Sequence, residues 1–458
     1  MQKSTLLFLL LLISAYAFHI GRQRSRQLVD GKVKNLHSLP SYYGYYTALW
    51  SLLPPLALVF LWIAFETSVI NNMVLASLPG ANSNMPSELK GLLINDLNNA
   101  LGGNYGDAKP ELKDSVEYLR SLKIRSNWLL SFLAISLALL GAFFGRSHIT
   151  KEHRARNQVE RTVMAFLVGS SLIAILTTLG IVLSVLFESI RFFDKVPITD
   201  FLFGLQWSPQ IAMRADQAGS AGAFGAVPLF TGTLLISSIA LIVAVPIGLM
   251  SAIYLAEYAS LKFRSVAKPL LEILAGIPTV VYGFFAVLTV APFIRELGTD
   301  LGLNVSSESA LAAGLVMGIM IIPFVSSLSD DFINAVPQSL RDGAYALGAT
   351  QSETIRQVVI PAALPGIVGG ILLAASRAIG ETMIVVMAAG LAANLTANPL
   401  EAVTTVTTQI VTLLVGDQEF DSPKTLAAFA LGLVLFLVTL VLNIIALHIV
   451  RKYREQYE

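Results

Sequence analysis

The sequence predicts an all-α integral membrane protein with about nine transmembrane helices, and three observations carry this prediction. Of the 458 residues, 55% are hydrophobic and 13% are charged, and the mean hydropathy is +0.68. A soluble domain would carry about 25% charged residues. Several apolar runs reach the ~20 residues that a helix needs to cross ~30 Å of hydrocarbon. Basic and acidic loops also alternate along the chain, as expected when successive spans end on opposite sides of a membrane.

Nine predicted spans follow from the apolar runs. They lie near 3–19, 47–65, 127–145, 163–188, 230–256, 269–294, 309–329, 366–391 and 426–450. Lysine and arginine gather after the first, third, fifth and ninth spans, whereas the loops after the sixth and eighth spans are acidic. Because basic loops stay inside, the N-terminus is predicted outside the cell membrane, and the C-terminus and residues 330–365 are predicted on the cytoplasmic side.

The first span has a second interpretation. Leu6–Ala17 is as long as the apolar region of a secretory signal and ends in a small residue. Only Lys3 precedes this run, and a basic cluster follows it. Cleavage after Ala17 would leave that cluster outside, so we expect a retained span.

The spans divide the chain into two regions. Residues 1–160 hold three spans and one long external segment, about 66–126, whereas residues 161–458 hold six spans. Apolar residues recur at helical spacing in the external segment: Leu92, Leu93, Leu97, Leu101, Val116, Leu119 and Leu122. A small helical cap and a solvated spacer both fit this pattern. No internal repeat indicates an inverted-repeat transporter.

A polar island separates the seventh and eighth spans. It begins with Arg341-Asp342-Gly343-Ala344-Tyr345-Ala346-Leu347-Gly348 and runs on to Pro361. Gly348 can take the left-handed conformation that ends one helix, and Pro361 fits the first turn of another. The island therefore predicts a helix–turn–helix that presents a short docking helix at the membrane surface.

Arg377 and Glu381 are the costliest residues in the eighth span. A charge at the centre of a bilayer costs about 2.5–3.5 kcal/mol on insertion scales. Their spacing of four predicts one helical face, within reach of each other and directed into the bundle. We interpret Arg377 as a positive group on an anion pathway that Glu381 holds or releases, although a self-neutralising pair that joins helices also fits.

The sixth span contains a predicted break. Pro278 should free a backbone carbonyl and kink the helix, while Gly276 and Gly283 permit close helix approach. Ordinary kinked packing explains these residues. The same holds for the glycine pairs 314/318 and 366/370, which predict small-residue packing faces.

The sequence lacks the residue patterns that ATP hydrolysis, metal binding or other catalysis would need. No GxxxxGK[ST] stretch occurs, so the chain has no phosphate-cradling P-loop, and there is no cysteine. The five histidines are scattered over loops and membrane edges. We therefore expect no catalysis, no metal, no cofactor and no nucleic-acid partner, and we expect ATP hydrolysis on a separate subunit.

Three of these motifs together resemble one family. Asp342, Ala344 and Gly348 resemble the cytoplasmic EAA loop of ABC-importer permeases, with Asp342 where Glu is usual and Gly343 in place of the first Ala. With 276–283 and 377–382, residues 161–458 resemble the PstC-type permease of the bacterial phosphate ABC importer. The resemblance implies a six-helix type I (MetI-like) permease bundle with an EAA-like loop at 336–365.

The resemblance also implies partners and roles. The partners would be a PstA-type permease, PstB-type ATPase subunits and a PstS-type periplasmic phosphate-binding protein, around a chain embedded in the lipid bilayer of a bacterial inner membrane. Arg377 and Glu381 would be the intramembrane charged pair, and Asp342, Gly343, Ala344, Gly348 and Pro361 would belong to the ATPase-docking loop. Residues 1–160 have no counterpart in the compact form of the family. A permease for sulfate or phosphonate, an ion-coupled secondary transporter and a membrane phosphate sensor remain alternatives.

Overall fold

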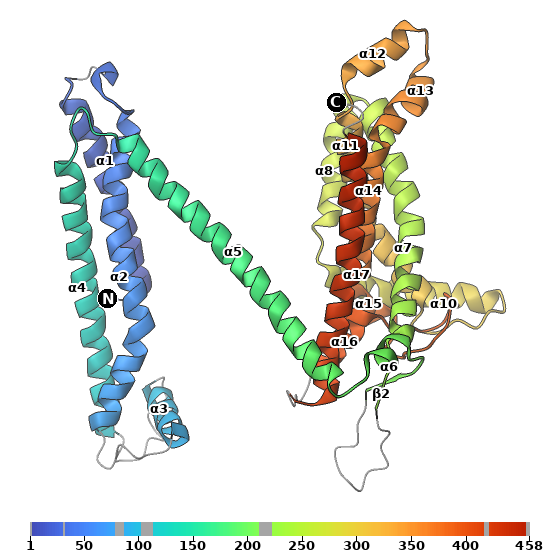
Figure 1. Ribbon diagram of the computed structural model, residues 1–458, viewed down its shortest axis with the longest axis horizontal. Coiled ribbons are helices and arrows are strands. Elements are labelled where there is room, and N and C mark those ends of the chain that lie inside the picture. The colour runs from blue at the N-terminus through green and yellow to red at the C-terminus, as the bar shows by residue number, and fades with distance from the viewer. Residues whose placement is uncertain are drawn as a thin grey trace. The chain divides into compact units, whose positions relative to one another are not determined.

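The computed structural model describes residues 2–30, 33–77, 87–101, 113–209, 222–415 and 421–454, and helices dominate it (Figure 1). The chain forms two compact units, Met1–Leu176 and Thr177–Glu458. Their boundary falls inside one helix, α5 (Ala155–Phe193). Each unit is built around its own buried clusters of apolar residues.

The first unit is a bundle of three long helices, α1 (Lys3–Gln27), α2 (Pro40–Ser77) and α4 (Lys113–Ser147), which pack against one another (Figure 1). A 3₁₀ turn, η1 (Val33–Asn35), lies between α1 and α2. Small residues bring the helices together. A Cβ atom at Gly141 of α4 would lie 2.1 Å from the carbonyl oxygen of Trp50 on α2, so even alanine would force these two helices apart.

The external segment predicted at 66–126 is helical where the structure describes it. α3 (Ser87–Leu101) packs against α4. Five buried residues from α2, α3 and α4 form a small core there: Ile70, Val74, Leu97, Val116 and Leu119. This core favours the helical cap over the solvated spacer, and its position outside the membrane stays a prediction.

The second unit is centred on α7 (Val227–Ile253) and α11 (Ala310–Asn334), which share its largest buried cluster. Glycines allow this contact, as predicted. A Cβ atom at Gly314 would lie 2.6 Å from the Ile239 side chain, and one at Gly318 would lie 3.0 Å from the Ala240 carbonyl oxygen. Next to this pair lies α14 (Ile360–Ile379), which packs on α11 and on the last helix, α17 (Pro423–Arg454).

Shorter elements complete the second unit. At one end, α6 (Ile198–Phe203) precedes a two-stranded antiparallel sheet of β1 (Trp207–Ser208) and β2 (Ala223–Phe224). A π turn, η3 (Tyr254–Tyr258), follows α7 at the other end. The remaining elements are α8 (Leu261–Ala275), α9 (Thr279–Phe285), η4 (Ala286–Val290), α10 (Ala291–Asp300), α12 (Gln338–Ala346), α13 (Gln351–Thr354), η5 (Ile355–Val359), α15 (Met383–Ala388) and α16 (Val406–Leu414).

Nine helical segments within the described ranges are long and apolar enough to cross a membrane. They are Lys3–Gln27, Pro40–Ser77, Asp114–Ser147, Ala155–Phe193, Val227–Tyr258, Thr279–Asp300, Ala310–Asn334, Gln351–Ile379 and Pro423–Lys452. Each overlaps one predicted span, so the predicted all-α membrane class is confirmed. Large apolar side chains such as Phe132 and Ile242 point outward from these helices, which is favourable in lipid and costly in water.

Candidate functional site

The polar island between α11 and α14 forms the predicted helix–turn–helix. α12 ends at Ala346, and Gly348, two residues further on, has a φ of +88° in the left-handed region. The Ala349 N–H donates to the Ala344 carbonyl (3.1 Å) and the Gly348 N–H donates to that of Tyr345 (2.9 Å), which is the hydrogen-bond pattern of a glycine-terminated helix. The predicted role of Gly348 in ending this helix is confirmed.

The second helix of this hairpin begins earlier than predicted. Thr350 and Glu353 form a capping box that starts α13 at Gln351. Helical backbone then runs through the π turn η5 into α14. Pro361 does occupy the first turn of α14, but the expectation that a new helix starts there is wrong. The π turn directly before Pro361 is a place where regular hydrogen bonding is already interrupted, so the proline is accommodated without a break.

Several residues of α12 and of the turn after it are exposed within the described ranges of the chain. Asp342 is exposed and accepts a hydrogen bond only from Gln338 of the same helix (3.0 Å) within the described residues. A Cβ atom at Gly343 would meet nothing within 4 Å. Ala344 is half-buried, and Leu347 is 91% exposed. In Figure 1, α12 and α13 extend beyond the long helices of the second unit. Such a surface is available to another protein.

An arginine attaches this hairpin to the bundle, and the sequence did not indicate this function. Arg341 of α12 forms an ion pair with Glu257 of η3 at 2.9 Å, and the two side chains are 11% and 10% exposed. Arg341 also donates to the carbonyls of Ile333 and Val336 at the end of α11, each at 2.8 Å. The Gln351 amide donates to the Glu257 carbonyl (2.8 Å). Both helices of the hairpin are thus fixed to η3, which follows α7. An acidic residue at the end of the apolar run 230–256 was the only signal in the sequence.

A second polar network lies near this end of the unit. Asp330 of α11 has a side chain that is 4% exposed, and it accepts from Arg264 (2.9 Å) and Lys268 (2.7 Å) of α8. The hydrogen bond to Asp330 raises the pKa of Lys268. α8 itself has no buried residue, and Arg264 and Lys268 join it to α11.

Arg377 and Glu381 do not lie on one helical face. Arg377 is in the last turn of α14, which ends at Ile379, and Glu381 lies beyond the helix. The Glu381 carboxylate accepts from the backbone N–H groups of Met383 (3.2 Å) and Ile384 (3.5 Å) at the start of α15. The prediction of an i,i+4 pair is therefore wrong. Gly380 is a weak helix former, and a carboxylate at the start of a helix satisfies free N–H groups there.

Arg377 is exposed in this chain, so the prediction that it points into the bundle is wrong; it borders an open cavity of about 550 Å³ lined by residues of α11, α14 and α17. Its guanidinium carbon lies 5.8 Å from the centre of the Phe324 ring on α11. Ser376 and Asn443, which also line the cavity, are joined by a hydrogen bond from the Ser376 hydroxyl to the Asn443 side-chain oxygen (3.0 Å). Arg377 has no ion-pair partner among the described residues. Phe324 and Asn443 were not predicted, because no sequence signal separates them from packing residues.

The predicted break at Pro278 is a complete separation of two helices. α8 ends at Ala275, Gly276 caps it, and Pro278 precedes α9 with ψ of 136°. The predicted span 269–294 is therefore wrong at its start, since the membrane-length segment begins at Thr279. The Leu274 carbonyl, four residues before Pro278, accepts from the Tyr282 hydroxyl at 2.8 Å.

The two glycines of this motif behave differently. A Cβ atom at Gly283 would lie 2.7 Å from the Met387 sulfur of α15, so the predicted close approach is confirmed there. At Gly276 the nearest atom belongs to its own helix end, at 3.3 Å, and the predicted close approach is wrong. The contact at Gly283 places α9 against the short helix that directly follows Glu381.

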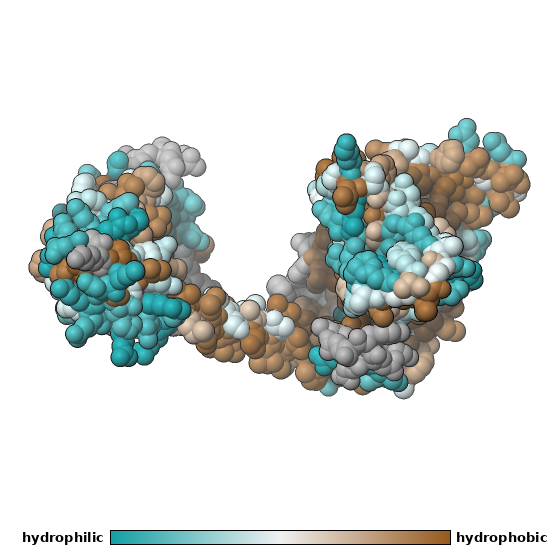
Figure 2. Space-filling view, turned by 90° about the horizontal axis from the view of Figure 1, so that it is seen from above, coloured by the Kyte–Doolittle hydropathy of each residue, from teal (hydrophilic) through white to brown (hydrophobic). Residues whose placement is uncertain are grey.

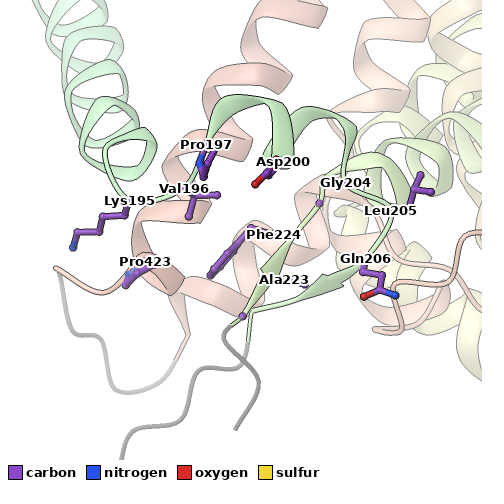
Figure 3. A pocket seen from close by; sticks show the side chains of 12 residues that line it. Lys195, Val196, Pro197, Asp200, Gly204, Leu205, Gln206, Ala223, Phe224 and Pro423 are labelled. Atoms are coloured by element: carbon purple, nitrogen blue, oxygen red, sulfur yellow. The ribbon is translucent and has the colours of Figure 1, made fainter.

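A polar hollow lies at the opposite end of the second unit from α12. Its volume is about 670 Å³, and Figure 3 shows side chains from the connection between α5 and α6, from α6 and from the sheet around it. Lys195 and Asp200 give it both signs of charge. Arg191 forms one ion pair with Glu188 inside α5 and a second with Asp421, and the second pair joins α5 to the segment before α17.

Comparisons with known proteins agree with this architecture. Residues 7–177 match the family described as "Phosphate ATP-binding cassette transporter", and residues 244–455 match "Binding-protein-dependent transport system inner membrane component". The probable ABC transporter permease protein YqgH of Bacillus subtilis is 34% identical over 240 residues, covering 52% of this chain and 74% of that protein.

The phosphate transport system permease protein PstC 1 of Mycobacterium tuberculosis is 34% identical over 280 residues, covering 55% of this chain and 81% of that protein. Among solved structures, a bacterial ABC transporter involved in the import of the acidic polysaccharide alginate has a TM-score of 0.44 and 15% identity. That comparison covers 66% of this chain and 99% of the other.

Proposed function

This chain belongs to the family of PstC-type phosphate transport system permeases, and from that membership we propose that it is the permease subunit of an ATP-driven importer of inorganic phosphate. The observation that carries the proposal is Arg377. Its guanidinium has no ion-pair partner among the described residues and borders a cavity between three transmembrane helices. A cation there offsets the cost of moving an anion through a region of low dielectric constant.

In this proposal Arg377, Asn443 and Glu381 have different roles. Arg377 supplies the charge, and the Asn443 amide beside it supplies further hydrogen-bond donors for phosphate oxygens. Glu381 holds the first turn of α15 through two backbone N–H groups. A change in the position of α15 would therefore move the end of the pathway next to Arg377. α9 packs on α15 at Gly283 and would move with it.

The energy for transport would come from a separate ATPase. We propose that PstB-type subunits dock on the exposed side of α12, at Asp342, Gly343, Ala344 and Leu347. The ion pair between Arg341 and Glu257 and the continuous helical backbone from Gln351 to Ile379 would carry a displacement of this hairpin to Arg377. Rigid helices and ion pairs are suitable carriers of such coupling.

The remaining proposals concern partners and orientation. A PstA-type permease would complete the bundle, and a PstS-type binding protein would deliver phosphate at the end that carries the 670 Å³ hollow. We propose that this end faces outward, because the basic loops gather at the other end. We also propose residues 1–160 as a membrane extension and 161–458 as the permease domain. Separate family matches at 7–177 and 244–455 support a division of this kind.

Reconstituted transport tests this function. Proteoliposomes that contain the four kinds of subunit should take up labelled phosphate only with both ATP and the binding protein. Replacing Arg377 by Gln should lower the rate about tenfold or more, since hydrogen bonds to charged groups contribute about 1.5–3 kcal/mol. Uptake without ATP would indicate an ion-coupled transporter, and an unchanged rate in an Arg377→Gln protein that inserts normally would remove Arg377 from the pathway.

A second substrate fits the same cavity. One guanidinium and one amide bind any tetrahedral oxyanion, so sulfate or a phosphonate would satisfy Arg377 and Asn443 equally. Competition of unlabelled sulfate and methylphosphonate with labelled phosphate in the same vesicles separates these possibilities. We expect phosphate alone to compete fully, because the binding protein selects the anion before it reaches the cavity.

A further inference from the structure

A basic hollow lies at one end of the first unit, outside the pathway described above. Its volume is about 570 Å³. Lys34 and His37 from the connection between α1 and α2 line it, together with Lys151 and Arg154 from the connection between α4 and α5. Glu152 is the one acidic residue among those that line it. Figure 2, which views this end of the unit, shows a largely hydrophilic surface there.

Hydrogen bonds hold the two connections together. The His37 N–H donates to the Lys151 carbonyl (3.2 Å), and the Arg156 N–H donates to the Ser38 hydroxyl (3.3 Å). The Tyr43 hydroxyl donates to the His153 carbonyl (3.0 Å). Backbone and neutral groups make these contacts. The cations of the hollow are therefore brought together by the fold and not by bridging carboxylates.

The charge of the hollow is not balanced within the described parts of the chain. Lys34, Lys151 and Arg154 form no ion pair there, whereas the neighbouring Arg156 pairs with Glu160 at 2.6 Å. Three cations around one carboxylate repel one another, and an anion in the hollow would relieve this repulsion. Lysine and arginine donors converging on one space are the usual means of holding a phosphate group.

The hollow borders the start of a membrane span. Exposed apolar and aromatic side chains lie at the beginning of α2, including Leu39 (62% exposed), Tyr45 (51%) and Trp50 (41%). Tyrosine and tryptophan are enriched at the level of lipid headgroups. Basic pockets between transmembrane helices at this level bind anionic headgroups.

We propose that this basic hollow binds an anion that carries a phosphate group, through Lys34, Lys151 and Arg154. The headgroup of an anionic phospholipid and free phosphate share this chemistry. The site would give the first unit a ligand of its own. It is independent of phosphate passage through the second unit, because it shares no residue with the Arg377 cavity.

Native mass spectrometry of the full-length chain tests whether the headgroup of an anionic phospholipid binds in the hollow. Phosphatidylglycerol and phosphatidylcholine with the same acyl chains would be titrated against wild type and the double variant Lys34→Gln/Arg154→Gln. A control, Arg120→Gln/Arg125→Gln, removes the same charge from exposed positions on α4 far along the helix. We expect phosphatidylglycerol to bind about tenfold more weakly to the first variant and equally to wild type and control.

Calorimetry with inorganic phosphate tests whether free phosphate binds in the hollow. The protein carries Arg377→Gln so that the transport cavity does not contribute. Loss of phosphate binding on adding Lys34→Gln/Arg154→Gln, without a lipid effect, would assign free phosphate. The proposal is overturned if neither ligand distinguishes the hollow variant from wild type. It is also overturned if the Arg120→Gln/Arg125→Gln control weakens binding as much, since bulk charge would then explain the result.

Discussion

The guanidinium of Arg377 lies in a transmembrane helix and borders a cavity with an aromatic ring on one side. Its transfer into the bilayer costs about 2.5–3.5 kcal/mol. A cation over an aromatic ring gains about 1 kcal/mol at an exposed site, so the contact with Phe324 offsets only part of this cost. The rest has to come from water or from an anion in the cavity.

Glu381 should stabilise the resting protein independently of Arg377, because its carboxylate bonds to the start of α15. We expect the losses of thermal stability in Arg377→Gln and Glu381→Gln to add in the double variant, with a coupling below about 0.5 kcal/mol. Thermal unfolding of the four proteins measures this coupling. A coupling of about 2 kcal/mol or more would instead indicate a direct ion pair between the two side chains.

His153 should make the first unit sensitive to acid. Its Nε2 atom is buried, and its ring packs on the ring of Tyr46 with 4.8 Å between the two ring centres. Burial, and secondarily the charge of His148, lowers the pKa of His153 below its usual 6.5. A lowered pKa means that folding favours the neutral ring, so its contribution is present above pH 6.5 and is lost as the pH falls through the depressed value.

We therefore expect wild type to lose stability relative to His153→Gln as the pH falls below 6.5. Melting temperatures of both proteins across this range provide the measurement. His448→Gln, at an exposed position on α17, should follow wild type at each pH. Parallel curves for wild type and His153→Gln would contradict the assignment.

Residue types in an apolar run were sufficient to select Arg377 and Glu381 from the sequence, because charges are rare there. Their surroundings were not predictable. α14 ends before Glu381, whose carboxylate bonds the start of the next helix, and Phe324 and Asn443 come from distant helices. The free-energy cost of placing a charge in an apolar run can be read from the local sequence, whereas the group that the charged side chain contacts depends on the fold.

At the scale of elements, the α12–α13 hairpin depends on the different conformations of its two glycines. Gly348 has a φ of +88°, and Gly343 is inside α12 with open space where a Cβ atom would lie. Replacing each by Ala is the same chemical change in two environments. Gly343→Ala should stabilise the hairpin by about 0.5–1 kcal/mol, and Gly348→Ala should destabilise it by about 1 kcal/mol.

Hydrogen exchange of residues 338–350 would report both changes, and copurification of the ATPase would report their effect on docking. Weaker copurification with Gly348→Ala alone is the expected result. Equal exchange protection in the two variants would mean that the left-handed turn is not needed for this structure.

The ion pair between Arg341 and Glu257 should couple the hairpin to η3, the turn that follows α7. Removing one partner of a largely buried pair costs about 3 kcal/mol, so Arg341→Ala should free the hairpin while the long helices stay folded. We expect phosphate-stimulated ATP hydrolysis to become independent of transport. Arg356→Ala, at an exposed position of η5, is the matched control and should behave as wild type.

The hairpin itself was predictable because Gly348 and the residues after it have strong local preferences. The start of its second helix was not, since the Thr350–Glu353 capping box competed with Pro361 as a start signal. The break at 276–278 was likewise recognised but underestimated. A proline alone kinks a helix, whereas proline preceded closely by glycine ended one here.

At the scale of the whole molecule, composition and the length of apolar runs determined the class, because a bilayer allows few solutions for a chain of this kind. The contacts between distant segments could not be read in the same way. α9 meets α15 at Gly283, and α12 meets η3 through Arg341, in both cases across more than 80 positions of sequence. Such contacts depend on the three-dimensional arrangement of helices whose outer and inner faces are both apolar.

The packing of α1 leads to the last prediction, which concerns the integrity of the first unit. Leu6 and Leu10 are buried against α2 and α4, and a Cβ atom at Gly21 would lie 2.3 Å from Thr47. Lys3 also forms an ion pair with Glu66 of α2. Cleavage after Ala17 would remove Leu6, Leu10 and Lys3 and leave Glu66 without its cation.

We therefore expect the purified protein to retain α1, with an intact mass that includes residues 3–17. Leu10→Ala should destabilise the first unit by about 2–5 kcal/mol, as a cavity in a packed core does. Leu12→Ala, at an exposed position of the same helix, should have little effect. A mature N-terminus at Phe18, or equal stability of the two variants, would show that α1 is a removable segment and that α2 and α4 pack without it.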